Sequence, residues 1–316
     1  MSISGIDKKN ISQVCLIVED VEMMVENYRQ ILGWQIPADF QITHLYDHTE
    51  AEYYGEPTDA RAKISGFDLG GIQYELLQPL EERSSWYDFL NKNGDGIHHF
   101  AFFVPKTEPV VESFIQHGYQ VIHSGLFTGR SGRYTYLDTD RDLGIIIELL
   151  EHFGGSPSPK GPEFPKERGI GTDIVTQVGI IVHDIEATAQ RLSNLLGVPE
   201  PTIIETPGYD ISKTTYKGEK SDSTAKLAFF NTGQVQLELI EPDHQPSVWR
   251  DWLNEHGEGA QHIALNIKDT KKVVDYLGGH GIEVLQQGLY ADGSGMYTYV
   301  DSQIKLGTTL ELLENF

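Results

Sequence analysis

Two sets of four polar residues could each bind a metal ion, and the sets have almost the same spacing in the chain. Each set has one Gln, one His and two Glu, placed in stretches that are otherwise apolar. A buried carboxylate is costly unless it is paired or bound to a metal. Alone, such a Glu would be an exposed edge residue and such a His a hydrogen-bonded core residue, but their joint duplication favours a site with N and O ligands. The candidate ligands are Gln13, Glu75, His99 and Glu148 in the first set and Gln177, Glu238, His262 and Glu311 in the second.

The duplication extends well beyond these residues. From Glu56 onward, residue n matches residue n+163 without an insertion, and further upstream the offset is 164. Self-similarity at a fixed period indicates repeated structural units. The sequence therefore predicts a first domain over 1–152, a Pro- and Gly-rich linker over 153–170 and a second domain over 171–316.

Each copy opens with an apolar strand, then an Asp in N-cap position, then an amphipathic helix that ends at Gly. Asp20 and Gly33 bound this helix in the first copy, and Asp184 and Gly197 bound it in the second. Further strands follow, and the cycle restarts inside each copy, in the first at IHHFAFFV. One strand, one helix and three strands thus occur four times. This order predicts an α+β fold of four βαβββ modules, with helices on one face of two curved sheets.

Composition restricts the possible partners. With 24 Lys and Arg against 47 Asp and Glu, the formal net charge is −23, which opposes binding to nucleic acid and anionic lipid. The sequence has no apolar signal region near its start and no apolar run long enough to span a membrane. We therefore expect a cytoplasmic protein, monomeric or homodimeric, that acts on a small molecule. Cys15 is the single cysteine, and we interpret it as a small buried hydrophobe rather than a nucleophile.

Residues near one strand of the first copy could bind the substrate. Tyr134 and Tyr136 alternate along this strand and could line a pocket, although packing explains them equally well. Three arginines surround the same strand, and arginine binds carboxylate and phosphate in a bidentate manner. We therefore expect the first copy to bind an anionic substrate and the two copies to differ in function. The arginines are Arg130, Arg133 and Arg141, which align with Gly293, Met296 and Ile304.

The module pattern and the ligand set resemble the vicinal-oxygen-chelate superfamily, which includes glyoxalase I, methylmalonyl-CoA epimerase, extradiol dioxygenases and bleomycin-resistance proteins. The segments GDGIHHFAFFV and GEGAQHIALNI are similar to the opening of the second module in the epimerases, and the Gln, Glu, His, Glu set is similar to that of glyoxalase I. The resemblance implies two modules around each divalent metal (Zn, Ni, Co, Mn or Fe) and a substrate with vicinal oxygens. It leaves open whether both modules of a site come from one copy. It implies the first-strand ligands Gln13, His99, Gln177 and His262 and the last-strand ligands Glu75, Glu148, Glu238 and Glu311.

The expected reaction follows from this ligand chemistry. One His and two carboxylates differ from the triad of two His and one carboxylate in non-haem iron oxygenases, which disfavours a dioxygenase. A metal that polarises a carbonyl favours an epimerase or isomerase that moves the α-proton through an enolate, on an acyl-CoA or on a sugar- or cyclitol-like substrate. Glu148 and Glu311 are the candidate bases, with Glu75 and Glu238 as counterparts on the opposite face. The alternatives are a glyoxalase-type lyase and a non-catalytic binding or resistance protein of the same fold.

Overall fold

The computed structural model describes residues 3, 6, 10–154 and 169–316 of the chain. The predicted linker over 153–170 therefore lies mostly outside the described residues. The division into domains at 152 and 171 stays a prediction.

The first copy forms a ten-stranded sheet with five short helices, and helix α1 continues as a π-helical turn over Tyr28–Leu32. Its elements are β1 Gln13–Ile17, α1 Val21–Asn27, β2 Gln41–Ile42, α2 Tyr46–Thr49, β3 Glu52–Tyr53, β4 Glu56–Pro57, β5 Ala62–Leu69, β6 Ile72–Pro79, α3 Ser85–Asn93, β7 Gly96–Phe103, α4 Thr107–Gln116, β8 Val121–Leu126, β9 Gly132–Leu137, α5 Asp140–Leu143 and β10 Ile146–His152.

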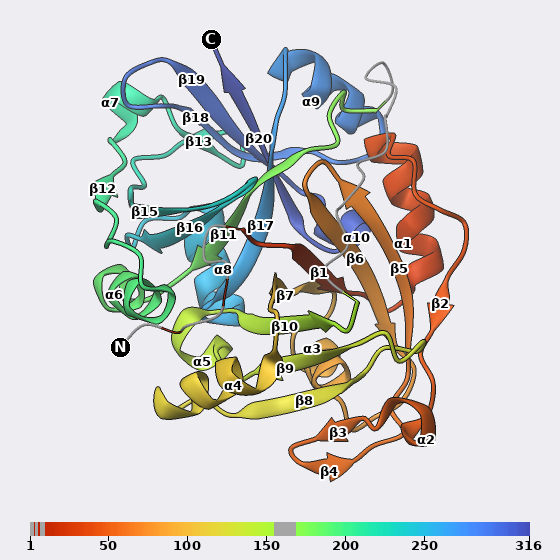
Figure 1. Ribbon diagram of the computed structural model, residues 1–316. Helices are drawn as coiled ribbons and strands as arrows, with labels where there is room; N and C mark the ends of the chain where they lie inside the picture. Colours follow the sequence, from red (N-terminus) through yellow and green to blue (C-terminus); the bar gives the residue numbers. More distant parts are fainter. Residues whose placement is uncertain (1–2, 4–5, 7–9, 155–168) are drawn as a thin grey trace.

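The second copy repeats this arrangement element by element, and Figure 1 shows the two curved sheets side by side. Its elements are β11 Val175–Ile181, α6 Ile185–Leu196, β12 Ile204–Glu205, α7 Tyr209–Ser212, β13 Thr215–Tyr216, β14 Glu219–Lys220, β15 Ala225–Thr232, β16 Val235–Pro242, α8 Val248–His256, β17 Gly259–Asn266, α9 Thr270–Gly279, β18 Val284–Leu289, β19 Gly295–Val300, α10 Gln303–Leu306 and β20 Thr309–Asn315.

The strand order shows whether the two modules of a sheet come from one copy or from both, which the sequence left open. The first sheet runs β2-β5-β6-β1-β7-β10-β9-β8-β3-β4, and the second sheet has the corresponding order. Strand β1 opens the first module and lies antiparallel to β7, which opens the second module of the same copy. Strands β11 and β17 pair in the same way. Both modules of each sheet therefore belong to one copy.

The βαβββ pattern is confirmed, and each copy has an additional hairpin, β3–β4 in the first and β13–β14 in the second. In the first copy β2 pairs with β5, whereas the hairpin β3–β4 pairs with β8 of the second module. These two-residue strands are too short to give a periodic sequence signal. The hairpin belongs to the first module and pairs with the second module, at the end of the sheet.

The first helix of each copy begins as the sequence predicts. The Asp20 carboxylate accepts a hydrogen bond from the Met23 amide at 3.0 Å, and Asp184 caps α6 in the same way through the Ala187 amide at 2.9 Å. Gly33 ends the first helix in the left-handed region at φ 77° and ψ 13°, where glycine is unstrained. None of the helices in the described part of the chain is both long and apolar enough to cross a membrane.

The hydrophobic core lies behind the sheets and joins the two copies. Val14 and Leu16 face this core from β1 together with helix residues of both copies. Helix α1 packs on α10, and α5 packs on α6, as Figure 1 shows. The buried Tyr28 hydroxyl donates to the Leu306 carbonyl at 2.8 Å, which connects the copies directly. Smaller apolar clusters lie on the opposite, concave faces, around Trp86 and Trp249.

Candidate metal centres

Sheet register brings the candidate ligands of the first copy into two adjacent rows. In one row, Cys15 on β1 lies between Glu75 on β6 and His99 on β7. In the next row, Ala101 on β7 is the partner of both Gln13 and Glu148. Side chains two residues apart on a strand share a face. The four predicted residues therefore lie together on the concave face, and Cys15 lies between two of them, Glu75 and His99.

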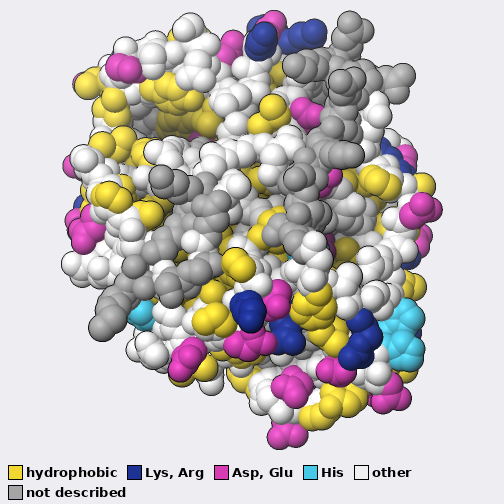
Figure 2. Space-filling view, in the orientation of Figure 1, with side chains coloured by type: hydrophobic (Ala, Val, Ile, Leu, Met, Phe, Trp, Pro, Cys, Tyr) yellow, Lys and Arg dark blue, Asp and Glu magenta, His cyan; other side chains and the backbone are white. Residues whose placement is uncertain are grey.

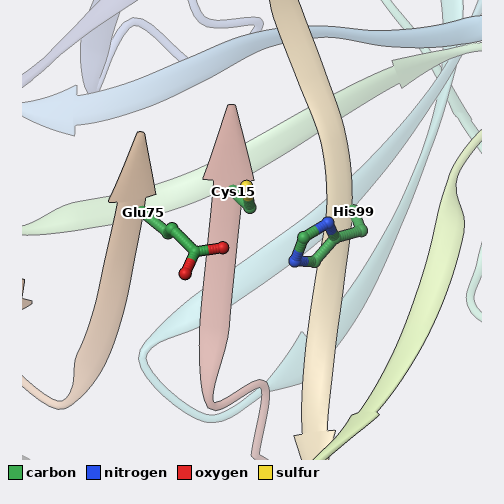
Figure 3. A group of neighbouring side chains, drawn as sticks. All are labelled: Cys15, Glu75 and His99. Atoms are coloured by element: carbon green, nitrogen blue, oxygen red, sulfur yellow. The ribbon is translucent and has the colours of Figure 1, made fainter. Parts of the chain in front are cut away.

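The first centre contains buried donor atoms without hydrogen-bond partners. His99 Nε2 lies 3.1 Å from Glu148 Oε2, but this contact lacks hydrogen-bond geometry and both atoms are unsatisfied. One donor atom each of Cys15, Glu75 and His99 lies within 4.8 Å of the other two. Figure 3 shows these three side chains on neighbouring strands. Buried polar atoms usually have a partner, so this group can accept a cation.

The second centre is more compact. His262 Nε2 lies 3.5 Å from Glu238 Oε2 and 3.3 Å from Glu311 Oε2. All three residues are buried, and these three atoms have no hydrogen-bond partner. Gln177 lies in the register row of Glu311, as Gln13 does in that of Glu148, and its amide donates to Gln236 at 3.0 Å. The quartet of the second copy is thus brought together as well.

The charges of both centres suit a divalent cation. The pKa of Glu75 is raised to about 7, chiefly by burial and next by the nearby Glu148 carboxylate, while His99 lowers it by less. Burial also raises the pKa of Glu238 to about 7. Burial lowers the pKa of His262, but the carboxylates of Glu238 and Glu311 outweigh it and raise the pKa to about 9. Without a metal these groups hold protons that a cation would displace.

Different residues contact the Nδ1 atoms of the two candidate histidines. His99 Nδ1 lies 2.8 Å from Nδ1 of His98, whereas His262 Nδ1 lies 3.2 Å from the amide oxygen of Gln261. Burial lowers the pKa of His98, so this ring is neutral. When the ligand ring donates its Nδ1–H, its Nε2 keeps the lone pair that a metal requires. The sequence interpretation missed His98 and Gln261, although each directly precedes the candidate ligand.

A cavity of about 580 Å³ opens onto the first centre. Gln13, Glu75 and Glu148 contribute to its lining, as do the predicted residues Tyr134 and Tyr136. Burial raises the pKa of both tyrosine hydroxyls, so they stay neutral and can donate hydrogen bonds. The cavity has room for a small molecule beside the candidate ligands.

The predicted arginines point elsewhere. Arg130 pairs with Glu50 and Arg133 pairs with Glu108, and neither lines the cavity. Arg141 stacks on Tyr119, with its Cζ atom 5.3 Å from the ring centre. No Lys or Arg occurs among the described residues of the lining. On the face in Figure 2, basic side chains likewise lie beside acidic ones. Substrate binding by Arg130 and Arg133 gains no support here and stays a prediction.

Sequence interpretation also missed the place of Cys15 in the first centre. Its side chain is fully buried, and burial raises the pKa of its thiol, as does the adjacent Glu75 carboxylate. Alternation along β1 put Cys15 on the face of Gln13, which was the available signal. Its place between Glu75 and His99 comes from the pairing of β1 with β6 and β7, and the bulge in the pairing with β7 comes only after Cys15. This pairing between distant strands cannot be seen in the sequence.

A family of known proteins matches each copy of the chain. The family model described as the Glyoxalase/Bleomycin resistance protein/Dioxygenase superfamily matches residues 12–136 and again 176–300. The uncharacterized protein YqjC of Bacillus subtilis (strain 168) is 27% identical over 97 residues, which cover 30% of this chain and 69% of that protein.

A solved structure shares the architecture of the chain. A triple mutant of 4-hydroxymandelate synthase from Streptomyces coelicolor superposes with a TM-score of 0.61 at 14% identity, over 97% of this chain and 92% of that chain. Methylmalonyl-CoA epimerase from Mycobacterium tuberculosis matches 50% of this chain and 93% of its own, at 21% identity and a TM-score of 0.36. The first match shows a common fold. The TM-score of the second match is too low to show one. With both copies matched by the family model, the chain belongs to the Glyoxalase/Bleomycin resistance protein/Dioxygenase superfamily, also called the vicinal-oxygen-chelate superfamily.

Proposed function

We propose that each copy holds one divalent metal and that the first copy is an epimerase or isomerase that moves a proton α to a carbonyl. The observation that carries this proposal is the pair of glutamates in the lining of the 580 Å³ cavity. Glu75 and Glu148 stand on strands β6 and β10, on either side of the two central strands. Two carboxylates on opposite sides of one substrate can remove and return a proton on different faces.

The proposed roles use groups that the chain supplies. A bound divalent metal would polarise the substrate carbonyl and make the α-hydrogen more acidic. Gln13, His99 and the two glutamates would hold it. Glu148 takes the α-proton, and Glu75 delivers a proton to the opposite face. The neutral Tyr134 and Tyr136 hydroxyls orient the oxygens of the substrate.

The second copy would bind its metal through the corresponding quartet. Glu311 and Glu238 are the corresponding proton-transfer candidates. A cytoplasmic location and a monomeric or homodimeric state remain predictions. An anionic substrate would find no Lys or Arg in the described cavity lining, so its charge would be balanced mainly by the metal.

Deuterium exchange tests the proposed reaction directly. Metal-loaded protein is incubated in D₂O with a panel of α-branched acyl thioesters and hydroxyketones, and loss of the α-proton signal is followed by NMR. We expect exchange in at least one class. Glu148→Gln should suppress this exchange more than it weakens substrate binding, and Glu112→Gln on the exposed face of α4 is the control.

Other outcomes would favour the other activities of the superfamily. Strict consumption of oxygen would indicate a dioxygenase. Conversion of a hemithioacetal without exchange of its α-proton with solvent would indicate a glyoxalase-type lyase. Binding of a ligand by metal-free protein, with no turnover, would indicate a binding or resistance protein. Each of these results would contradict the proposed epimerase.

A further inference from the structure

Besides His98 and Gln261, the two centres differ in the residue that is paired with the ligand histidine on the neighbouring strand. Strand β1 carries Cys15 between Glu75 and His99, whereas β11 carries Gly179 between Glu238 and His262. Both copies otherwise keep the same Gln, His and two Glu. A thiol therefore lies in the ligand row of the first centre only.

Space around Gly179 shows that the exchange changes the centre itself. A Cβ atom at Gly179 would lie 1.8 Å from Cε1 of His262, so the imidazole ring fills this space in the second copy. In the first copy the Cys15 side chain occupies the corresponding position, and His99 cannot lie as His262 does. Accordingly, His99 Nε2 contacts Glu148 at 3.1 Å, whereas His262 Nε2 lies within 3.5 Å of both of its glutamates.

The Cys15 thiol has the surroundings of a ligand. A donor atom of Glu75 and one of His99 lie within 4.8 Å of its sulfur and of each other. The thiol donates to the Glu75 carboxylate and makes a weak 3.6 Å contact to the Leu16 carbonyl, the next residue on its own strand. Independently, the buried His99 Nε2 and Glu148 Oε2 have no hydrogen-bond partner. Unsatisfied donor atoms for a cation are thus present next to the thiol.

We propose that Cys15 is an additional metal ligand of the first centre, so that the two copies bind metals of different character. This inference rests on the proposed metal centres. On binding, the S–H bond breaks, its proton goes to solvent, and a bond forms between Sγ and the metal without any change of oxidation state. Thiolate favours thiophilic ions such as Zn²⁺, Co²⁺ and Cd²⁺, whereas the N and O donors of the second centre also suit harder ions such as Mn²⁺.

Cobalt absorption tests the proposal, because Cys15 is the only cysteine in the chain. Metal-free protein is titrated with Co²⁺ while bound cobalt and the near-ultraviolet charge-transfer band of a cobalt thiolate are both measured. We expect two bound Co²⁺ per chain and a thiolate band that reaches its full height with one of them. Cys15→Ser should lose the band and keep two cobalt ions, and His262→Ala should keep the band with one cobalt ion.

The outcomes distinguish a failure of the Cys15 assignment from a failure of the metal centres themselves. Two bound cobalt ions without a thiolate band in the wild-type protein would overturn the assignment of Cys15 and leave the metal centres intact. Absence of bound cobalt would overturn the metal centres themselves. The wild-type and His262→Ala measurements do not depend on the folding of the Cys15→Ser variant, so the assignment can be refuted even if that variant does not fold.

Discussion

Replacing Glu75 by Gln should change the pH dependence of stability in metal-free protein by a predictable amount. The pKa of Glu75 rises from 4.5 to about 7 on folding because the carboxyl is buried near Glu148. The folded state therefore binds more protons than the unfolded state in this window, and stability falls as pH rises through it. The shift corresponds to about 3 kcal/mol, which we reduce to about 2 to 3 kcal/mol because the side chain is partly open to the cavity.

The variant removes this titration, so the sign of the effect depends on pH. At about pH 4 the carboxyl is protonated in both states, and Glu75→Gln should have nearly wild-type stability. At about pH 8 the wild-type protein must bury the charged carboxylate, so the variant should be more stable by about 2 to 3 kcal/mol. Added metal should reverse the order, because it binds the wild-type centre and stabilises the folded state.

Urea denaturation with EDTA at the two pH values measures these differences, and Glu112→Gln on the exposed face of α4 is the control. The control should show the same difference from the wild type at both pH values. Our reasoning would be refuted if Glu75→Gln behaved like the control, with no gain in stability at the higher pH.

Three further substitutions test the elements that position the centres. Asp20→Ala removes the cap of α1 and should lower the free energy of unfolding by about 1 kcal/mol, as should Asp184→Ala for α6; equal stability to the wild type by urea denaturation would contradict this. Tyr28→Phe leaves the buried Leu306 carbonyl without its hydroxyl donor and should cost about 1 to 3 kcal/mol. An unchanged melting temperature for Tyr28→Phe would show that this bond does not stabilise the contact between the copies.

Much of the fold could be predicted because the sequence repeats the same pattern of strands and helices in both copies. Asp20 and Gly33 have strong local preferences for helix ends, and the structure confirms both. The four polar residues of each copy were predicted to converge because apolar strands rarely carry carboxylates. Their geometry agrees with that interpretation, and their role as ligands stays a proposal.

Other features depend on contacts that no local pattern encodes. The pairing of β1 with β7 follows from long-range packing, so the sequence could not choose between pairing within and across copies. The place of Cys15 between Glu75 and His99 depends on the pairing of β1 with β6 and β7. The arginines were predicted from charge and proximity in sequence, but acidic partners such as Glu50 and Glu108 were not visible there. Ion pairs between distant residues require the folded structure.

The count of bound metal ions tests the central claim most directly. Chelator-free protein and variants are loaded with a divalent metal, desalted and analysed for metal and protein by mass spectrometry. We predict two ions per chain in the wild type, one in His99→Ala, one in His262→Ala and none in the double variant. The matched control is His117→Ala with His280→Ala, which changes the histidines at the ends of α4 and α9 and should keep both ions. Unchanged metal content in a folded His99→Ala and His262→Ala double variant would contradict the account.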